Sequence, residues 1–251
     1  MIPQSLRDPS YLPTREEIEF WRWPGTNAFD NWDDYVHHNP LWFNFEILNR
    51  EFIDSLCSYL NKRIAEILES WKERAMILET WAWSWRLGHF LRDWLPHMKD
   101  WILKIISTDN LSWETSEFNP YFHIRRDYPV EVMDYRKAID KHPDIIITSW
   151  MPKDEDWTAD YRKCSSVGEY ILIWNQTDCW SDATWDERLI WKDDFSAMKL
   201  DVSWQMCFRD HPWNYANSST ISFRRANSGK DYFKKSEGSA PHRRSLSAPM
   251  T

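Results

Sequence analysis

Glycine is scarce in this chain, which has 5 glycines among 251 residues where ordinary usage predicts about 18. Tryptophan is abundant, at 19 residues. Many tryptophans stand where a glycine of a loop, a turn or a bulge is expected, namely Trp81, Trp83, Trp85, Trp113, Trp174, Trp180, Trp185, Trp191, Trp204 and Trp213. We hypothesise that tryptophan replaces glycine systematically, either by substitution or because UGA codons that encode glycine are translated as tryptophan. A naturally tryptophan-rich protein with aromatic binding surfaces is the alternative.

Cysteines and long apolar runs are also few. The four cysteines form no Cys-x-x-C pair and have no histidine at metal-ligand spacing, so we expect neither a zinc site nor a disulfide framework. Reduced thiols are typical of a cytoplasmic protein, and a nuclear one is possible. The apolar runs are far shorter than the roughly 20 residues that cross a bilayer, and the polar start lacks the apolar region of a signal peptide. We therefore expect no membrane partner.

The net charge is −8 and the isoelectric point is near 5.5. A negative surface repels phosphates, which makes a nucleic acid an unlikely partner and favours a small molecule or a protein. The length fits one α/β domain with appendages. The sequence carries no signal for the oligomeric state.

Composition divides the chain into three parts. Residues 1–40 are rich in Pro, Asp and aromatic residues without a sustained period, which predicts an irregular N-terminal arm. Residues 41–225 carry the periodic apolar pattern of a single domain, beginning with an amphipathic helix over residues 45–68. Residues 226–251 have almost no hydrophobic residues, which predicts a disordered tail.

Apolar runs alternate with helical segments through the domain, which predicts parallel β-α-β units. The expected strands cover residues 76–79, 101–106, 130–133, 144–149 and 169–174, and the expected helices cover 86–97, 135–141 and 158–164. Residues 204–209 and 219–224 are two further strands, and the loop between them has no room for a helix, so we expect an antiparallel pair. The pattern predicts an α/β fold: a doubly wound, mostly parallel, seven-stranded sheet with an antiparallel C-terminal hairpin.

A ligand of such a sheet lies beyond the carboxyl ends of its strands. With glycine at 81, 83 and 85, the first strand and the following loop read Ile-Leu-Glu-Thr-Gly-Ala-Gly-Ser-Gly. This resembles the first motif of class I S-adenosylmethionine-dependent methyltransferases, in which an acidic strand residue is followed by G-x-G-x-G. The resemblance implies a cofactor loop made by Glu79, Trp81, Ala82, Trp83 and Trp85.

The resemblance continues along residues 41–225. It implies that Asp109 contacts the ribose of S-adenosylmethionine and that Asp134 and Tyr135 contact its adenine. It places Ser149 and Trp150 near the transferred methyl group, and the implied substrate walls are Trp150, Met151 and Pro152. The implied activity is methyl transfer to a small molecule or protein without a metal ion. No catalytic residue can be assigned. Trp150 and Trp157 are expected to be native tryptophans because their surroundings resemble stretches of uncharacterised family members.

Other functions compete with this reading. Glycines at 83 and 85 together with Gly88 also spell the G-x-G-x-x-G of an NAD(P)-binding oxidoreductase, with Asp109 about 20 residues further on. The first strand ends near Glu79, so the tight turn begins at residue 81, which favours the methyltransferase. If the tryptophans are genuine, bulky side chains fill the cofactor loop. The chain is then a catalytically inactive methyltransferase fold that serves as an interaction module, or an aromatic-rich binder of sugars or peptides.

Overall fold

The computed structural model describes residues 8, 10–22, 48–70, 72–82, 86–96, 101–112, 128–174, 179–202 and 219–226. The helices are α1 (Arg15–Arg22), α3 (Arg50–Glu69), α4 (Arg86–Trp94), α5 (Tyr135–Ile139), α6 (Thr158–Lys163), the 3-10 helix η6 (Asp182–Trp185) and α7 (Glu187–Lys192). The strands are β1 (Ala75–Thr80), β2 (Leu103–Asp109), β3 (Glu131–Val132), β4 (Ile145–Ser149), β5 (Glu169–Trp174), β6 (Phe195–Lys199) and β7 (Ser219–Arg225).

The strands form one seven-stranded sheet in the order β3-β2-β1-β4-β5-β7-β6. The pairs among β1 to β5 are parallel, whereas β7 runs antiparallel to both β5 and β6. Strand order reverses between β1 and β4, because the chain moves outward from β1 to β3 before it returns to β4. The predicted fold class is therefore confirmed. In open α/β sheets a ligand crevice forms where the strand order reverses, and we call this region, at the carboxyl ends of β1 and β4, the crevice.

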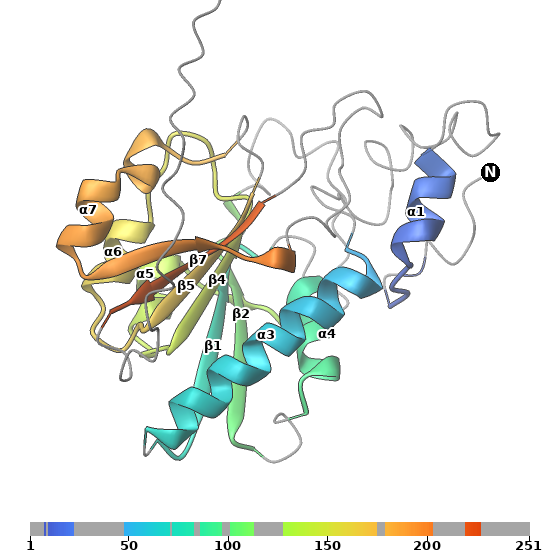
Figure 1. Cartoon of the computed structure of the whole chain (residues 1–251), viewed down its shortest axis with the longest axis horizontal. Helices are drawn as coiled ribbons and strands as arrows, with labels where there is room; N and C mark the ends of the chain where they lie inside the picture. The colour runs from blue at the N-terminus through green and yellow to red at the C-terminus, as the bar shows by residue number, and fades with distance from the viewer. Residues whose placement is uncertain are drawn as a thin grey trace, which may run out of the picture.

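Helices cover both faces of the sheet, as Figure 1 shows. Side chains alternate across each strand, so that Ala75 and Ile77 of β1 pack in a cluster with α3 and α4, whereas Leu78 packs in a second cluster with α5 and α6. These two apolar layers, one on each face of the sheet, form the core and fix the positions of the strand ends.

The long helix α3 begins later than its apolar pattern suggested. Asn49 caps it, and the Asn49 side chain accepts a hydrogen bond from the Phe52 amide at 2.8 Å. A capping side chain satisfies a helix N–H that has no partner within the helix. Leu48 therefore precedes the helix, although it still packs in the core.

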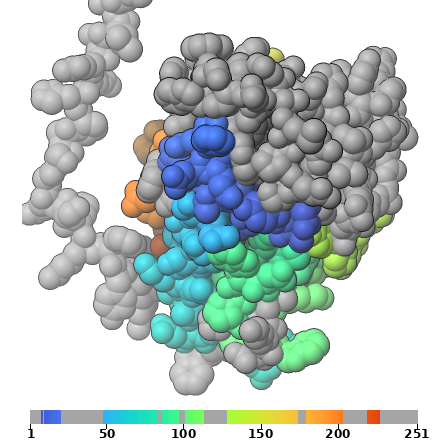
Figure 2. Space-filling model, turned by 90° about the vertical axis from the view of Figure 1, so that its right-hand side faces the viewer, coloured from blue at the N-terminus to red at the C-terminus, as the bar shows by residue number. Residues whose placement is uncertain are grey.

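The predicted N-terminal arm is not wholly irregular, because residues 15–22 form α1. The segment is anchored by hydrogen bonds from the Arg50 amide to the Pro13 carbonyl at 2.9 Å and from the Arg86 guanidinium to the Tyr11 carbonyl at 2.8 Å. Figure 2 shows it lying against α3 and α4. The predicted tail, apart from Ala226, lies outside the described residues.

The last strand was predicted correctly, but its partner was not. Both edges of β7 are occupied, one by β5 and the other by β6 at residues 195–199. Residues 204–209, which were expected to pair with β7, lie outside the described residues. The sequence pattern missed β6 because four of its five side chains are exposed, so no apolar alternation marks it.

Among the described residues, four of the eight non-glycine residues with positive φ are tryptophans: Trp81 (61°), Trp101 (60°), Trp150 (54°) and Trp180 (74°). Such left-handed backbone favours glycine, because a Cβ there crowds the carbonyl oxygen. The sequence-based hypothesis identified Trp81 and Trp180. It missed Trp101, and it set Trp150 apart as a native tryptophan, although Trp150 shares this left-handed backbone.

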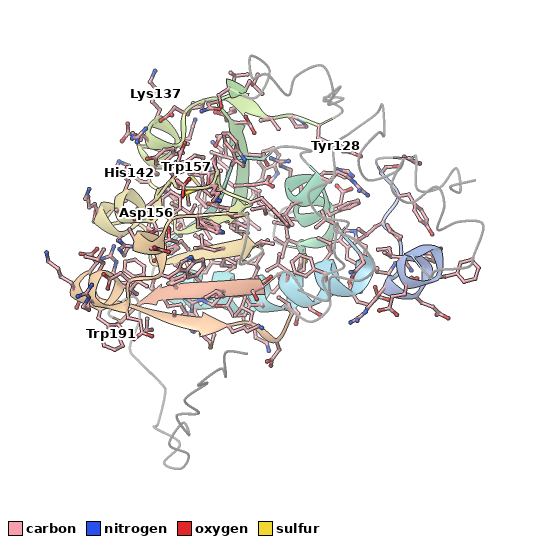
Figure 3. All side chains as sticks on the ribbon, turned by 90° about the horizontal axis from the view of Figure 1, so that it is seen from above. Tyr128, Lys137, His142, Asp156, Trp157 and Trp191 are labelled. Carbon is pink, nitrogen blue, oxygen red and sulfur yellow. The ribbon has the colours of Figure 1, made fainter. Side chains whose placement is uncertain are left out.

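Other tryptophans do not occupy turns. Trp174 ends β5, Trp185 ends η6, and Trp191 lies within α7, so the expectation of a turn at these three positions was wrong. Figure 3 shows Trp191 on the outer side of α7, away from Trp157. Trp101 and Trp191 are exposed on different elements, whereas Trp81, Trp150, Trp157 and Trp180 are buried. In the part of the chain that the structure describes, the tryptophans therefore do not form one exposed sugar- or peptide-binding cleft.

We predict opposite effects of glycine at two exposed tryptophans. Trp101 is 81% exposed and Trp191 is 63% exposed, so neither substitution removes much buried surface. Trp101→Gly relieves a left-handed backbone and should raise the free energy of unfolding by up to about 1 kcal/mol. Trp191→Gly places glycine in a helix and should lower it by about 1 kcal/mol. Urea denaturation measures both. Destabilisation by Trp101→Gly would contradict the backbone argument.

Candidate cofactor crevice

The end of β1 places two polar side chains on opposite faces of the sheet. Glu79 points towards α4, where it is 2% exposed. A Cβ on Gly88 would collide with both the Glu79 carboxylate and the Ser107 hydroxyl. Gly88 is therefore required for the close approach of α4 to β1. Arg92 donates a hydrogen bond to the Ser107 hydroxyl at 2.8 Å, which adds a positive charge beside the carboxylate.

Burial raises the pKa of the Glu79 carboxyl from its ordinary 4.5 to about 7, against the opposing effects of the Ser107 hydroxyl and the Arg92 charge. Between pH 4.5 and 7 the folded chain binds more protons than the unfolded chain at this residue. Stability therefore falls as pH rises through this range, by about 3 kcal/mol for a fully buried group. Denaturant titrations at pH 4.5, 6 and 7.5 measure the free energy of unfolding. In the Glu79→Gln variant, the fall of this free energy with rising pH should be smaller by about this amount. An unchanged slope in that variant would show that Glu79 does not titrate in this range.

On the other face of β1, three buried hydroxyl groups join the ends of two strands. Thr80 of β1 and Thr148 of β4 are register partners, and their hydroxyl oxygens lie 2.6 Å apart. The Tyr161 hydroxyl of α6 lies 2.9 Å from the Thr80 oxygen and 3.0 Å from the Thr148 oxygen. This cluster fixes the separation of β1 and β4 directly below the crevice. Sequence reasoning missed it, because threonines in strands carry no signal of a shared partner.

The indole of Trp81 lies inside the crevice. Trp81 follows β1 directly, is 8% exposed, and packs edge-on against Trp157 with ring centroids 5.4 Å apart. Trp157 in turn stacks on Tyr135, with centroids 4.3 Å apart and planes inclined by 12°. The indole of Trp81 thus fills the space between the end of β1 and the segment that joins β4 to α6. Ala82 is also buried, and its amide donates to the Thr108 carbonyl at 3.1 Å. Trp83 and Trp85 lie outside the described residues.

Asp109 is the last residue of β2 and is 1% exposed. Its carboxylate accepts a hydrogen bond from the Leu111 amide at 2.7 Å, and its carbonyl accepts one from the Met133 amide at 2.9 Å. These bonds hold a carboxylate at the edge of the sheet beside β1. Its predicted contact with the ribose stays a prediction.

Asp134 and Tyr135 follow β3, and both make contacts within the protein. Asp134 caps α5 by accepting a hydrogen bond from the Arg136 amide at 2.9 Å. Tyr135 is 6% exposed, and its hydroxyl donates to the Asp160 carboxylate at 3.0 Å. Burial and this bond raise the pKa of the Tyr135 hydroxyl. The predicted adenine contacts of both residues stay predictions.

The segment after β4 turns sharply at Trp150. Ser149 ends β4 and is half-buried, whereas Trp150 is buried, and its amide donates to the Ile173 carbonyl at 2.9 Å. Met151 has no exposed surface, and Pro152 is half-buried. The structure thus brings Trp150 to the carboxyl end of β4, but it places Met151 in the core. The predicted roles of the segment in substrate binding stay predictions.

The strand order identifies the fold. A sheet ordered 3-2-1-4-5-7-6, with only β7 reversed, is the seven-stranded sheet that the first-motif resemblance implied. The chain has the class I methyltransferase fold. Glu79, Trp81, Asp109 and Ser149 lie at the carboxyl ends of β1, β2 and β4, where this fold holds its ligand.

Comparison with known proteins gives fold-level matches alone. No protein-family model matches the chain, and no curated protein matches it. Solved structures similar to it include the DszA carbon methyltransferase, with a TM-score of 0.43, 11% identity, and coverage of 84% of this chain and 60% of that one. A SAM-dependent O-methyltransferase from Thermotoga maritima has a TM-score of 0.38 and 11% identity, over 71% of this chain and 66% of that one. The plantazolicin methyltransferase BpumL, solved with SAH, has a TM-score of 0.38 and 10% identity, over 84% and 97%. The chain therefore spans less than two thirds of the length of the first two.

Two further findings concern the described residues alone. None of their helices is long and apolar enough to cross a membrane. None of their histidine, cysteine, aspartate and glutamate side chains gather in a group of three that could hold a metal ion.

Proposed function

We propose that this chain, when glycine stands at residue 81, binds S-adenosylmethionine in the crevice and transfers its methyl group to a small molecule or protein. The observation that carries the proposal is the buried carboxylate of Asp109 at the end of β2, next to the turn that follows β1 at the point where strand order reverses. A bound S-adenosylmethionine supplies an electrophilic sulfonium methyl group, so the protein's task is to position the acceptor.

The fit of the cofactor to the residues present is incomplete. Asp109, Asp134 and Tyr135 lie at the ends of β2 and β3, as the proposed site needs. The indole of Trp81 leaves no room between β1 and Trp157, where the backbone must approach the ligand closely. The tryptophan at residue 81 is therefore incompatible with binding of the proposed cofactor.

The variant with glycine at 81, 83 and 85 tests whether the site prefers S-adenosylmethionine or a nicotinamide cofactor. Equilibrium dialysis against S-adenosylmethionine and, separately, against NADH should show binding of the first alone. Asp109→Asn should weaken that binding about tenfold, because an amide is a poorer acceptor for ribose hydroxyls than a carboxylate. Preference for NADH would replace the methyltransferase proposal by the oxidoreductase alternative.

The packing of Trp81 favours a second candidate function for the sequence as written. With the indole in place, we propose a methyltransferase fold that binds no cofactor and serves as an interaction module. The unsubstituted chain should then unfold cooperatively, and S-adenosylhomocysteine should leave its melting temperature unchanged. A rise in that temperature would exclude this role.

A further inference from the structure

One edge of the sheet is formed by β6, which within the described residues pairs with β7 alone. In an antiparallel pair, the backbone of every second residue bonds to the neighbouring strand and that of the others points away. The Leu200 amide donates to a β7 carbonyl at 2.9 Å, and the Asp194 carbonyl accepts from the residue after β7 at 2.7 Å. Even-numbered residues therefore bond to β7. The N–H and C=O groups of Phe195, Ala197 and Lys199 point outward, away from the sheet.

The sequence of β6 does little to oppose the addition of a further strand. Natural sheets protect their edges with proline, with bulges or with several charged side chains. In Phe-Ser-Ala-Met-Lys the single charged residue is Lys199, and the continuous register with β7 contains no bulge. Met198 is 42% exposed, and Trp191, shortly before β6 on the outer side of α7 (Figure 3), is exposed as well. Such an edge accepts a strand from another chain.

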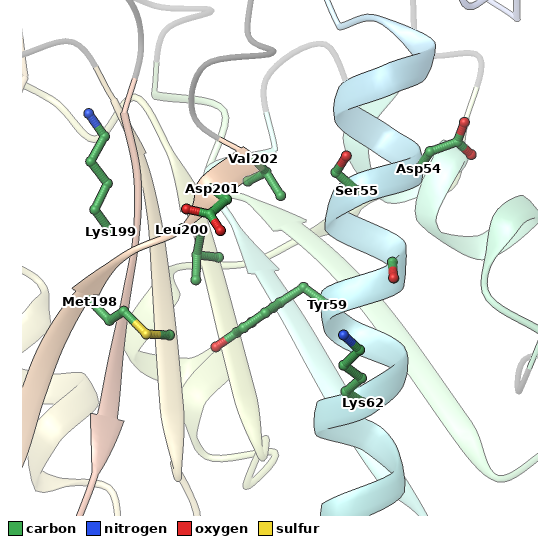
Figure 4. Close-up of a pocket in the computed structure, with 10 residues that line it drawn as sticks. Asp54, Ser55, Tyr59, Lys62, Met198, Lys199, Leu200, Asp201 and Val202 are labelled. Atoms are coloured by element: carbon green, nitrogen blue, oxygen red, sulfur yellow. The ribbon is translucent and has the colours of Figure 1, made fainter. Parts of the chain in front are cut away.

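The hollow beside β6 is a separate feature of this region. It has a volume of about 550 Å³ and lies between α3 and residues 198–202, with Tyr59 and Met198 in its lining (Figure 4). The Tyr59 hydroxyl donates to Glu169 of β5 and, at 3.1 Å, to Ser222 of β7. The hollow therefore lies inward of β6, over β5 and β7. A strand that pairs with the outer edge does not enter it.

The outer edge of β6 is complementary to a second copy of itself. In an antiparallel pair, two facing residues either both bond to each other or both point away, and a two-fold axis makes the two strands equivalent. An axis through Ala197 meets both conditions, because Ala197 then faces its own copy and Phe195 faces Lys199 of the second copy. All the outward-pointing residues are paired, with about six hydrogen bonds. An axis through Ser196 or Met198 leaves one outward residue of each strand unpaired within β6.

The side chains suit the same register. Ala197 is small, so no bulky groups meet at the axis. The two copies of Lys199 lie at opposite ends of the paired strands rather than facing each other. Each lies opposite Phe195 of the other copy, close to the aspartates at 193 and 194 that precede it. Opposite charges at such cross-strand distances attract, so charge favours pairing of β6 with itself.

Asp201 is the acidic residue just beyond β6. It would face Asp193 of the second copy if the pairing continued past the strand. The Asp193 carboxylate is already held by Arg162, whose Nε lies 2.8 Å away. Because the Arg162 charge offsets that of Asp193, this approach adds little repulsion.

We propose that two copies of this chain associate through β6, with the two strands antiparallel and Ala197 on the two-fold axis. The two sheets then join into one continuous sheet. The crevice lies at the carboxyl ends of β1 and β4, away from this edge. Association therefore stands or falls independently of methyl transfer.

Analytical ultracentrifugation of the full chain should show a dimer that dissociates on dilution. Ala197→Pro removes an outward N–H but no hydrogen bond to β7, so it should raise the dimer dissociation constant about tenfold with the circular dichroism unchanged. Ala197→Glu and Ala197→Lys each place like charges on the axis and should each weaken the homodimer. An equimolar mixture of the Glu and Lys variants should restore dimers, because in the proposed register residue 197 of one copy faces residue 197 of the other.

Amide hydrogen exchange, followed by NMR, locates the contact. The Ser196 and Met198 amides bond to β7 and should be protected at every concentration of the chain. The amides of Phe195, Ala197 and Lys199 should become protected only as the dimer forms.

Three results would overturn the proposal. The first is a monomer at about 100 µM chain. The second is a dimer that the mixed Glu and Lys variants do not restore, which would mean that the copies touch elsewhere. The third is protection of the Ala197 amide in the dilute monomer, which would mean that the chain covers its own edge.

Discussion

Replacing Trp81, Trp83 and Trp85 together by glycine should raise the affinity for S-adenosylmethionine by at least a hundredfold, from no measurable binding to micromolar dissociation constants. The Trp81 indole occupies the crevice against Trp157, and its φ of 61° is one that glycine adopts without a steric cost. Isothermal titration calorimetry measures the change. Trp81→Gly alone should produce part of this gain in affinity, because it removes the indole that packs against Trp157 in the crevice.

The matched control is Trp180→Gly. Trp180 also has positive φ and is buried, but it follows β5 rather than β1 and pairs with Lys153 through an isolated bridge. Its replacement should leave the affinity for S-adenosylmethionine unchanged in the triple-glycine background. If the triple variant folds, as judged by circular dichroism, and still binds no S-adenosylmethionine, then Trp81 is not what blocks the crevice.

The second large effect concerns stability. Glu169→Ala should lower the free energy of unfolding by about 3 to 5 kcal/mol, because it removes the buried carboxylate partner of the Arg63 guanidinium and leaves it only the exposed carboxylate of Glu66. The Arg63 side chain is 4% exposed and that of Glu169 is fully buried, and the Arg63 Nε lies 2.5 Å from the carboxylate. The Glu169 carboxylate also accepts hydrogen bonds from Ser222 and Tyr59. It therefore links α3 to β5 and β7.

Urea denaturation tests this effect with two companion variants. Arg63→Met combined with Glu169→Leu removes both charges and should recover most of the lost stability. Lys163→Gln removes one member of an exposed pair, in which the lysine side chain is 75% exposed, and should change stability by less than about 0.5 kcal/mol. Equal losses from Glu169→Ala and Lys163→Gln would mean that burial does not govern the energy of the Arg63 pair.

The sequence predicted the parallel half of the sheet well because its strands are buried. β1, β4 and β5 are continuous apolar runs, so their positions could be read within one or two residues. β2 begins two residues later than predicted, since Trp101 and Ile102 precede it. The exposed edge strand β6 has no such run, and α1 is a single short helix, so both escaped prediction.

The site was predicted unevenly for similar reasons. Glu79 and Asp109 could be located because a strand ends at or next to each of them. The left-handed backbone at Trp101 and Trp150 could not be predicted, since tryptophan gives no sign of positive φ. Tyr161 was not identified because its partners, Thr80 and Thr148, come from distant parts of the chain and meet only when β1 and β4 pair.

The place of β7 between β5 and β6 has a consequence for synthesis on the ribosome. β5 is complete at residue 174 and β6 at residue 199, but neither can reach its final partner until residues 219–225 have emerged. At 5 to 20 residues per second, the edge of β5 is exposed for several seconds during translation. The nascent chain therefore carries an open apolar strand edge over that interval. Any release of the polypeptide before residue 219 leaves the edge of β5 without β7, a substrate for chaperones and proteases.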